Sequence, residues 1–213
     1  MNHIVGFLNV KPDGNCGFRV IASRVFGDQE LWRLVRRAEL SEINSQRLPI
    51  YQNTFYHLLE PNIRRITWEG KGCGPDHYMN TPDDLFPIAT AYNAVIFMFG
   101  NVNPDTLDGC RYCTTIMPMS NPRAPAVTEP AIEICICHLD SYQHYIRLDL
   151  SDSCPIPPIH GLWRKHHDPS VDGWDRRYHS RIKKWRSMHP HVIDLDPIFM
   201  DLSEWLHSVD FIS

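Results

Sequence analysis

One of the seven cysteines of the chain stands where a nucleophile could form. Cys16 lies in the stretch DGNCGFR, after an Asp-Gly turn and at the start of a segment with helical periodicity. A helix N-terminus presents backbone N–H groups that lower the pKa of a thiol and can bind a developing oxyanion. Gly14 and Gly17 allow close backbone approach, and Asp13 can order the turn by accepting hydrogen bonds. The pattern predicts a thiolate nucleophile beside an oxyanion hole.

Such a thiol also needs a base, and two of the twelve histidines lie in predicted strands. His144 opens the segment HYIRLDL, and His138 lies in the preceding segment AIEICICHL. A strand holds a ring more firmly than a loop does, so we take His144 as the general base and His138 as its rival. The alternative interpretation makes Cys16 a buried structural thiol and His144 an ordinary strand histidine.

Helices are predicted in the first half of the chain from the spacing of apolar residues. The expected helices cover about residues 16–26, 29–45, 51–59 and the stretch PDDLFPIATAY. Thr81 and Asp84 form a possible capping box for the last of these, and Pro87 is expected to weaken or kink it.

Strands are predicted mainly in the second half, where short apolar runs are bounded by turn residues. The expected strands are IVGFLNV, AVIFMFG, CTTIMPM, AIEICICHL and HYIRLDL. Only DSYQ separates the last two, which favours an antiparallel hairpin. Helices followed by strands indicate an α+β domain over residues 1–150.

The C-terminal part, residues 151–213, is predicted to be an extension with a proline-rich connector and one basic amphipathic helix. The shared apolar face of this helix is expected to pack on the domain, and comprises Trp174, Tyr178, Ile182 and Trp185. Eight Lys and Arg residues against three Asp residues between Trp163 and Arg186 could bind nucleic acid. A solvated basic face is the commoner explanation, and contact with a protein partner is a third.

Composition sets the remaining expectations. A net charge of -4 argues against a surface built entirely for nucleic acid, so nucleic acid is not expected as a partner. The sequence lacks a secretory signal and a long apolar span, so we expect an intracellular protein, in cytoplasm or nucleus, that is monomeric and has no membrane partner. The odd number of cysteines favours reduced thiols.

A zinc site is the competing interpretation of the other cysteines. CRYC (Cys110 to Cys113) and CICH (Cys135 to His138) together contain enough ligands for tetrahedral zinc. Alternation along a strand would, however, turn His138 away from the two cysteines, so no metal and no cofactor is expected.

Three stretches in this order resemble the OTU (ovarian tumour) superfamily of cysteine proteases: DGNCGFR, MNTPDDLFPIATAYNAVIFMF and QHYIRLDL. The resemblance covers about residues 5–150, and the extension is similar to one seen on fungal OTU-like proteins. It implies a papain-like fold with helices on a small, mostly antiparallel sheet. It also implies cleavage after the C-terminal glycine of ubiquitin or a ubiquitin-like modifier, so ubiquitin, polyubiquitin chains or ubiquitinated proteins are the expected partners.

Position by position, the resemblance matches Cys16 to the nucleophile, His144 to the general base and Asp13 to the aspartate beside the oxyanion pocket. Many members carry an Asp or Asn two residues after the histidine, where this chain has Ile146. Asn9 is the first candidate for the missing orienting group and Asp140 the second. If neither reaches the ring, a catalytically weak ubiquitin-binding module becomes the alternative. The basic tail supports a third hypothesis, a nucleic-acid-associated accessory protein that acts through this tail.

Overall fold

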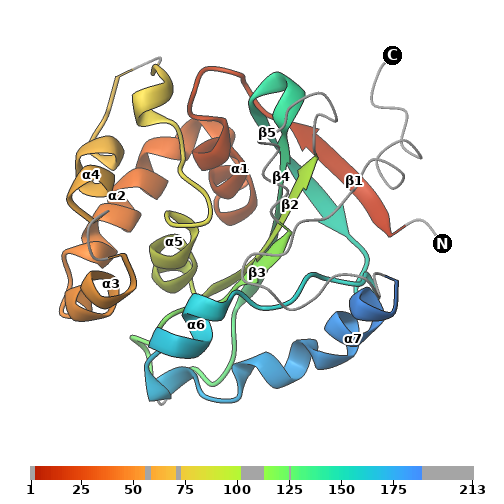
Figure 1. Cartoon of the computed structure of the whole chain (residues 1–213). Helices are drawn as coiled ribbons and strands as arrows, with labels where there is room; N and C mark the ends of the chain where they lie inside the picture. Colours follow the sequence, from red (N-terminus) through yellow and green to blue (C-terminus); the bar gives the residue numbers. More distant parts are fainter. Residues whose placement is uncertain (1–2, 56–58, 71–72, 102–112, 125, 189–213) are drawn as a thin grey trace.

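The computed structural model describes residues 3–55, 59–70, 73–101, 113–124 and 126–188 (Figure 1). Among the described residues, five α-helices lie between the first and second strands, and two follow the last strand. The helices are α1 (Cys16–Val25), α2 (Trp32–Ile43), α3 (Leu48–Phe55), α4 (Leu59–Ile66), α5 (Leu85–Tyr92), α6 (Gly161–His166) and α7 (His179–Met188).

The sheet contains the five predicted strands in the order β1-β5-β4-β2-β3. They are β1 (Ile4–Asn9), β2 (Ala94–Asn101), β3 (Thr114–Ile116), β4 (Ile132–Leu139) and β5 (His144–Leu150). All neighbours are antiparallel except β2 and β4, which are parallel. The predicted α+β class and the hairpin of β4 and β5 are therefore confirmed.

Helices cover the sheet from one side and the C-terminal segment covers it from the other (Figure 1). α1 packs on β4 and β5, and Arg147 of β5 reaches the Ser23 carbonyl of α1 at 3.3 Å. On the opposite side, Phe97 of β2 meets Tyr178 edge to face, with ring centroids 6.0 Å apart. One face of β5 thus packs on α1, and His144, the first residue of β5, lies at one end of the sheet.

Two local predictions about the helices are wrong. The single helix expected at 51–59 is replaced by α3 and α4. The capping box does not form, because the Thr81 hydroxyl bonds the Tyr145 hydroxyl at 2.9 Å and Asp84 pairs with Arg65. Pro87 is tolerated because it lies in the first turn of α5, where its missing N–H would have no partner within the helix.

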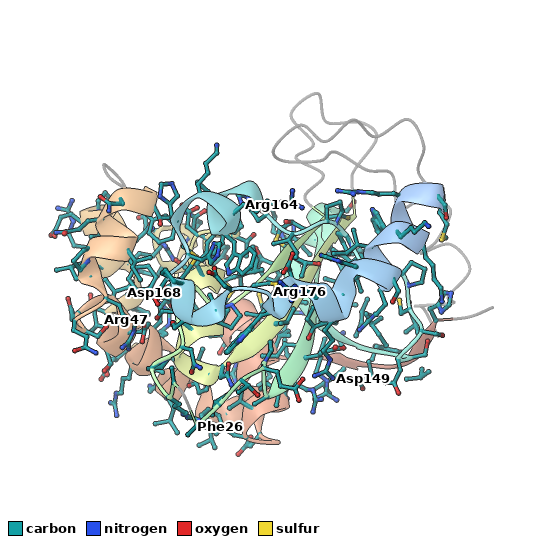
Figure 2. All side chains as sticks on the ribbon, turned by 90° about the horizontal axis from the view of Figure 1, so that it is seen from below. Phe26, Arg47, Asp149, Arg164, Asp168 and Arg176 are labelled. Carbon is teal, nitrogen blue, oxygen red and sulfur yellow. The ribbon has the colours of Figure 1, made fainter. Side chains whose placement is uncertain are left out.

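In the C-terminal segment, residues 151–188, the expected basic helix begins as a 3-10 helix, Trp174–Tyr178, and becomes α-helical only at His179, so the expected single α-helix is wrong in its first part. The four residues of its apolar face are 1–7% exposed. Figure 2 shows Asp168 and Arg176 on the segment as it crosses the sheet. Within the described ranges, no helix is long and apolar enough to cross a membrane.

Candidate active site

Cys16 is the first residue of α1 and is 7% exposed. The turn before it requires glycine at position 14, where φ is +82°. A Cβ atom there would lie 2.5 Å from the Cys73 carbonyl oxygen and 2.7 Å from the Tyr78 ring. Gly17 is covered in the same way by Met79. Both glycines of the motif thus let another segment, which includes residues 73–79, pack closely on the start of α1.

Asp13 orders this turn. Its carboxylate accepts a hydrogen bond from the Asn15 N–H at 3.1 Å and two from the Arg19 guanidinium, at 3.0 and 2.6 Å. Burial raises the pKa of Asp13, but these donors outweigh burial and hold the pKa below its ordinary value. The side chain is directed toward Arg19 of α1, which makes Asp13 a residue that shapes the turn.

The His144 ring is bonded to Asn9, the first of the two candidates for an orienting group. His144 Nε2 lies 2.8 Å from Asn9 Oδ1. Asn9 ends β1 and pairs directly with Ile146 of β5. Directly opposed residues of antiparallel strands share a face, so Asn9 presents its amide on the face where a residue at 146 would. The neighbouring strand therefore supplies the polar group that position 146 lacks, while the Asp140 side chain lies outside the described part of the chain.

The thiol and the imidazole lie at the same end of β5. The Cys16 sulfur accepts a hydrogen bond from the backbone N–H of Tyr145, the residue that follows His144. Burial raises the pKa of Cys16, and the N–H groups of Tyr145, Gly17 and Cys16 itself offset this only partly. The predicted lowering of the thiol pKa is therefore wrong, because the helix start is buried and burial penalises the thiolate more than the N–H donors favour it.

Burial also lowers the pKa of His144. A hydrogen bond with the Val10 backbone raises this pKa but offsets the effect of burial only in part. Both groups are therefore neutral over a wide pH range, since a lowered imidazole pKa and a raised thiol pKa each favour the uncharged form. Two neutral groups of this kind suit a mechanism in which a base takes the thiol proton during attack, rather than one that starts from a thiolate.

This neutrality predicts the pH dependence of thiol reactivity. In the free protein, the rate of alkylation of Cys16 by iodoacetamide should keep rising beyond the ordinary cysteine pKa of 9.0. Mass spectrometry of the Cys16 peptide at successive pH values measures this rate. A rate that is already constant between pH 6 and 8 would mean a preformed thiolate–imidazolium pair and would contradict the expectation.

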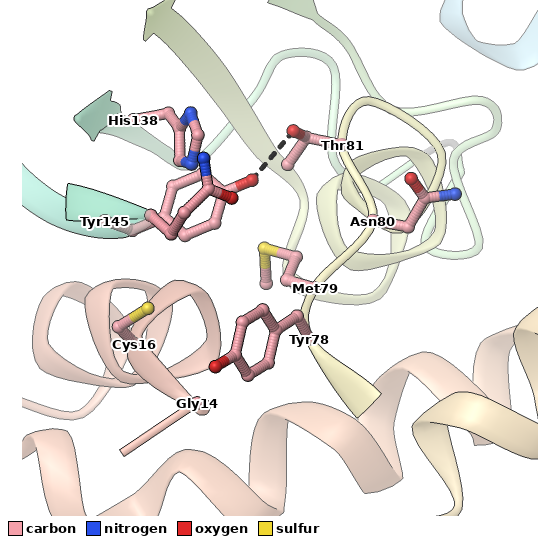
Figure 3. A pocket seen from close by; sticks show the side chains of 9 residues that line it. Gly14, Cys16, Tyr78, Met79, Asn80, Thr81, His138 and Tyr145 are labelled. Atoms are coloured by element: carbon pink, nitrogen blue, oxygen red, sulfur yellow. Dashed lines mark hydrogen bonds between the residues drawn. The ribbon is translucent and has the colours of Figure 1, made fainter. Parts of the chain in front are cut away.

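A cavity of about 180 Å³ opens beside the thiol (Figure 3). Its other lining comes from the turn before α1, the segment before α5 and the β4–β5 hairpin: Gly14, then Tyr78, Met79, Asn80 and Thr81, then His138, Gln143 and Tyr145. The hydrogen bond between Thr81 and Tyr145 joins these two walls. Met79, Asn80 and Thr81 belong to the second quoted motif, but a role in lining the cavity could not be predicted for residues 78–81, because it depends on tertiary packing against Gly14 and Gly17.

The rival histidine lines the same cavity. His138 is paired with Tyr145 across the hairpin, and the two ring centroids are 4.7 Å apart. In Figure 3 the Tyr145 ring lies between Cys16 and His138. The structure therefore associates His138 with the cavity wall and His144 with the polar group of β1.

The ligands of the zinc interpretation do not share one face of β4. Cys135 and Cys137 are buried on one face of β4, whereas His138 contacts Tyr145 on the other. Cys110 lies outside the described residues. Among the residues that are described, no three His, Cys, Asp or Glu side chains are placed to hold a metal ion.

The aromatic residues of the basic segment are unavailable for stacking on bases. Trp174, Tyr178 and Trp185 are at most 7% exposed, and Tyr178 packs on Phe97. Arg181 is turned inward and pairs with Glu133 at 2.9 Å. The nucleic-acid interpretation thereby loses its stacking component and retains only the exposed basic side chains of the segment.

No family model and no curated protein sequence matches the chain. The chain is similar to several solved structures of OTU domains. The OTUD1 OTU domain is 16% identical with a TM-score of 0.44, and the match covers 67% of this chain and 84% of that one. The viral OTU domain protease from Farallon virus is 19% identical, with a TM-score of 0.43 and coverage of 69% and 85%. That from Qalyub virus is 16% identical, with a TM-score of 0.43 and coverage of 68% and 84%. Likeness of this degree carries no argument about what this chain binds or cleaves.

Proposed function

We propose that the chain is a cysteine isopeptidase of the OTU kind, which cleaves after the C-terminal glycine of ubiquitin or of a ubiquitin-like modifier. The observation that carries the proposal is the 2.8 Å contact between His144 Nε2 and Asn9 Oδ1. It answers the one departure of this chain from the motif pattern, Ile146. The choice of modifier rests on the resemblance of the three motifs to the OTU superfamily.

In this proposal Cys16 attacks the carbonyl carbon of the modifier's last residue while His144 takes the thiol proton. The tetrahedral intermediate then collapses as the imidazolium returns this proton to the leaving amine, which leaves a thioester on sulfur. Water, deprotonated by His144, hydrolyses the thioester and regenerates the thiol. Asn9 accepts a hydrogen bond from the ring and keeps the other ring nitrogen available for these transfers.

The turn offers two backbone donors to the developing oxyanion. The N–H groups of Asp13 and Asn15 already bond the Lys11 carbonyl and the Asp13 carboxylate, each at 3.1 Å. We therefore assign the N–H groups of Gly14 and Cys16 as the oxyanion donors. Asp13 contributes indirectly, because its hold on the Asn15 N–H fixes the direction of both neighbouring peptide groups.

The test is covalent capture. The protein is incubated with full-length ubiquitin, and in parallel with ubiquitin-like modifiers, that carry an electrophile in place of the C-terminal carboxylate. Wild type should gain the mass of one modifier at Cys16, whereas Cys16→Ala and heat-denatured wild type should not. An adduct that persists in Cys16→Ala would place the nucleophile elsewhere.

Two other outcomes separate the alternatives. Modifier that binds without forming an adduct would favour the catalytically weak binding module, which the raised thiol pKa also allows. If no modifier binds or reacts, the proposed substrate class is wrong. A salt-sensitive affinity for nucleic acid, lost on charge reversal between Arg176 and Arg186, would then favour the accessory protein.

A further inference from the structure

Arg36 of α2 is a buried cation at the back of the candidate site. It is 2% exposed, and its guanidinium carbon lies 3.9 Å from the centre of the Phe18 ring. Among the described residues it forms no ion pair with a carboxylate, and its hydrogen bonds go to uncharged acceptors. Glu39 and Asp84 interact with this charge electrostatically but do not bond it directly, and burying a charge without a directly bonded counterion is costly. A buried arginine in this arrangement therefore calls for a role beyond filling space.

One terminal nitrogen of Arg36 donates to the Arg65 carbonyl of α4 at 3.2 Å, whereas the acceptors of the other belong to two segments that meet at the cavity. This second nitrogen donates to Asn15 Oδ1 at 2.9 Å and to the His77 carbonyl oxygen at 2.7 Å. Asn15 directly precedes Cys16 and is fully buried. His77 directly precedes the wall that packs on the turn glycines. One guanidinium thus joins the turn of the nucleophile to the opposite wall.

Arg36 is the main anchor of the Asn15 side chain. The other group near Asn15 Oδ1 is the Cys73 thiol, at 3.7 Å, which is a weak donor. Asn15 Nδ2 has no hydrogen-bond partner among the described residues. Loss of the guanidinium would leave the Asn15 amide held by that weak donor. The backbone N–H of Asn15 would stay bonded to the Asp13 carboxylate, so what is lost is the link through the side chain between the turn and the opposite wall.

The wall has a second support that does not touch the turn. Arg65 of α4 donates to the Tyr78 carbonyl at 3.0 Å and pairs with Asp84. Asp84 in turn accepts the Asn80 N–H at 2.9 Å. The wall would therefore remain folded without Arg36. The contribution of Arg36 is to fix the position of the wall relative to the turn.

We infer that Arg36 is a positioning residue for the proposed cleavage: through Asn15 and the His77 carbonyl it fixes the distance between the oxyanion donors of the turn and the wall formed by residues 78–81. This inference rests on the proposed function for its effect on rate. Small displacements of a preorganised donor weaken stabilisation of the transition state far more than binding of the substrate.

The test compares Arg36→Ala with Arg181→Ala. Arg181 of α7 is also a buried arginine, 8% exposed, but its partners are Glu133 of β4 and the carbonyl of Cys154 in the C-terminal segment. With a fluorogenic amide of the modifier as substrate, Arg36→Ala should lose about 10- to 100-fold in kcat with little change in KM. Arg181→Ala should keep the kcat of wild type per folded molecule.

Chemical rescue distinguishes positioning from a general loss of structure. Millimolar guanidinium chloride should restore part of kcat in Arg36→Ala, because the small cation fits the vacated site, and should have no such effect on Arg181→Ala. Arg36→Lys should fall between Arg36→Ala and wild type, because one ammonium cannot reproduce the planar fork. Equal kcat in Arg36→Ala and wild type would overturn the inference.

Hydrogen exchange keeps the inference testable if the substrate class is wrong. Backbone amides of residues 13–16 and 77–80 should exchange faster in Arg36→Ala than in wild type, and at wild-type rates in Arg181→Ala. An inactive wild type with this exchange pattern would refute the proposed function alone. Unchanged exchange at both segments would refute the anchoring by Arg36, whatever the substrate.

Discussion

Replacing Asn9 by alanine is expected to lower kcat about 100-fold for modifier amides, with KM nearly unchanged. Asn9 Oδ1 lies 2.8 Å from His144 Nε2, and the chain has no polar residue at position 146 to take its place. A ring that is free to rotate presents its basic nitrogen to the thiol only part of the time. Steady-state kinetics of the purified variant measure the effect.

Three further variants bracket this result. His144→Ala removes the base itself and should cost on the order of a thousandfold in kcat. Asn9→Asp keeps an acceptor and adds a negative charge, which favours the imidazolium. Activity should therefore persist, and the acid limb of the pH profile should move to higher pH.

Val5→Ala is the control: it alters a 68% exposed residue of the same strand and should behave as wild type. Wild-type kcat in Asn9→Ala would mean that β1 does not orient the ring.

Gly14→Ala should reduce the free energy of unfolding by about 3 kcal/mol and abolish adduct formation. The backbone at position 14 has φ of +82°, and the added Cβ would lie 2.5 Å from the carbonyl oxygen of Cys73. A backbone oxygen cannot rotate away as a side chain can, so the turn must shift. Urea denaturation gives the stability, and covalent capture by the modifier gives the activity.

Gly27 is a matched control for Gly14. Its φ is +74°, but a Cβ there would have no atom within 4 Å. Gly27→Ala therefore carries only the cost of the left-handed backbone, about 1 kcal/mol, and should leave adduct formation intact. If both variants lose the same stability and both keep activity, the close contact between Gly14 and Cys73 has no role in the site.

The strands could be predicted because local sequence determines most of what defines them. Runs such as AVIFMFG are short, apolar and bounded by turn residues, and the hairpin of β4 and β5 follows from the four residues between them. α4 was missed because Pro61 and two arginines obscure its narrow apolar face. Pro61 is accommodated in the first turn of that helix, as Pro87 is in α5.

Only those features of the site that depend on adjacent residues in the sequence could be predicted. The turn around Cys16 was recognisable from its glycines, but the pKa of its thiol was predicted in the wrong direction, since burial depends on what packs over the helix start. Asn9 was already the first candidate, ahead of Asp140, yet only the register between β1 and β5 shows that Asn9 lies directly opposite Ile146. Arg36 gave no signal, because its acceptors are 21 and 41 residues away.

β1 forms an outer edge of the sheet and is hydrogen-bonded to β5 alone among the described strands. An edge strand can separate from a sheet at a smaller free-energy cost than global unfolding requires. Such fraying would withdraw Asn9 and pull on the adjoining turn together, because both belong to one continuous stretch of backbone. Heat inactivation of the proposed enzyme would then precede its melting, and a ligand that pins this edge would protect activity more than it protects the fold.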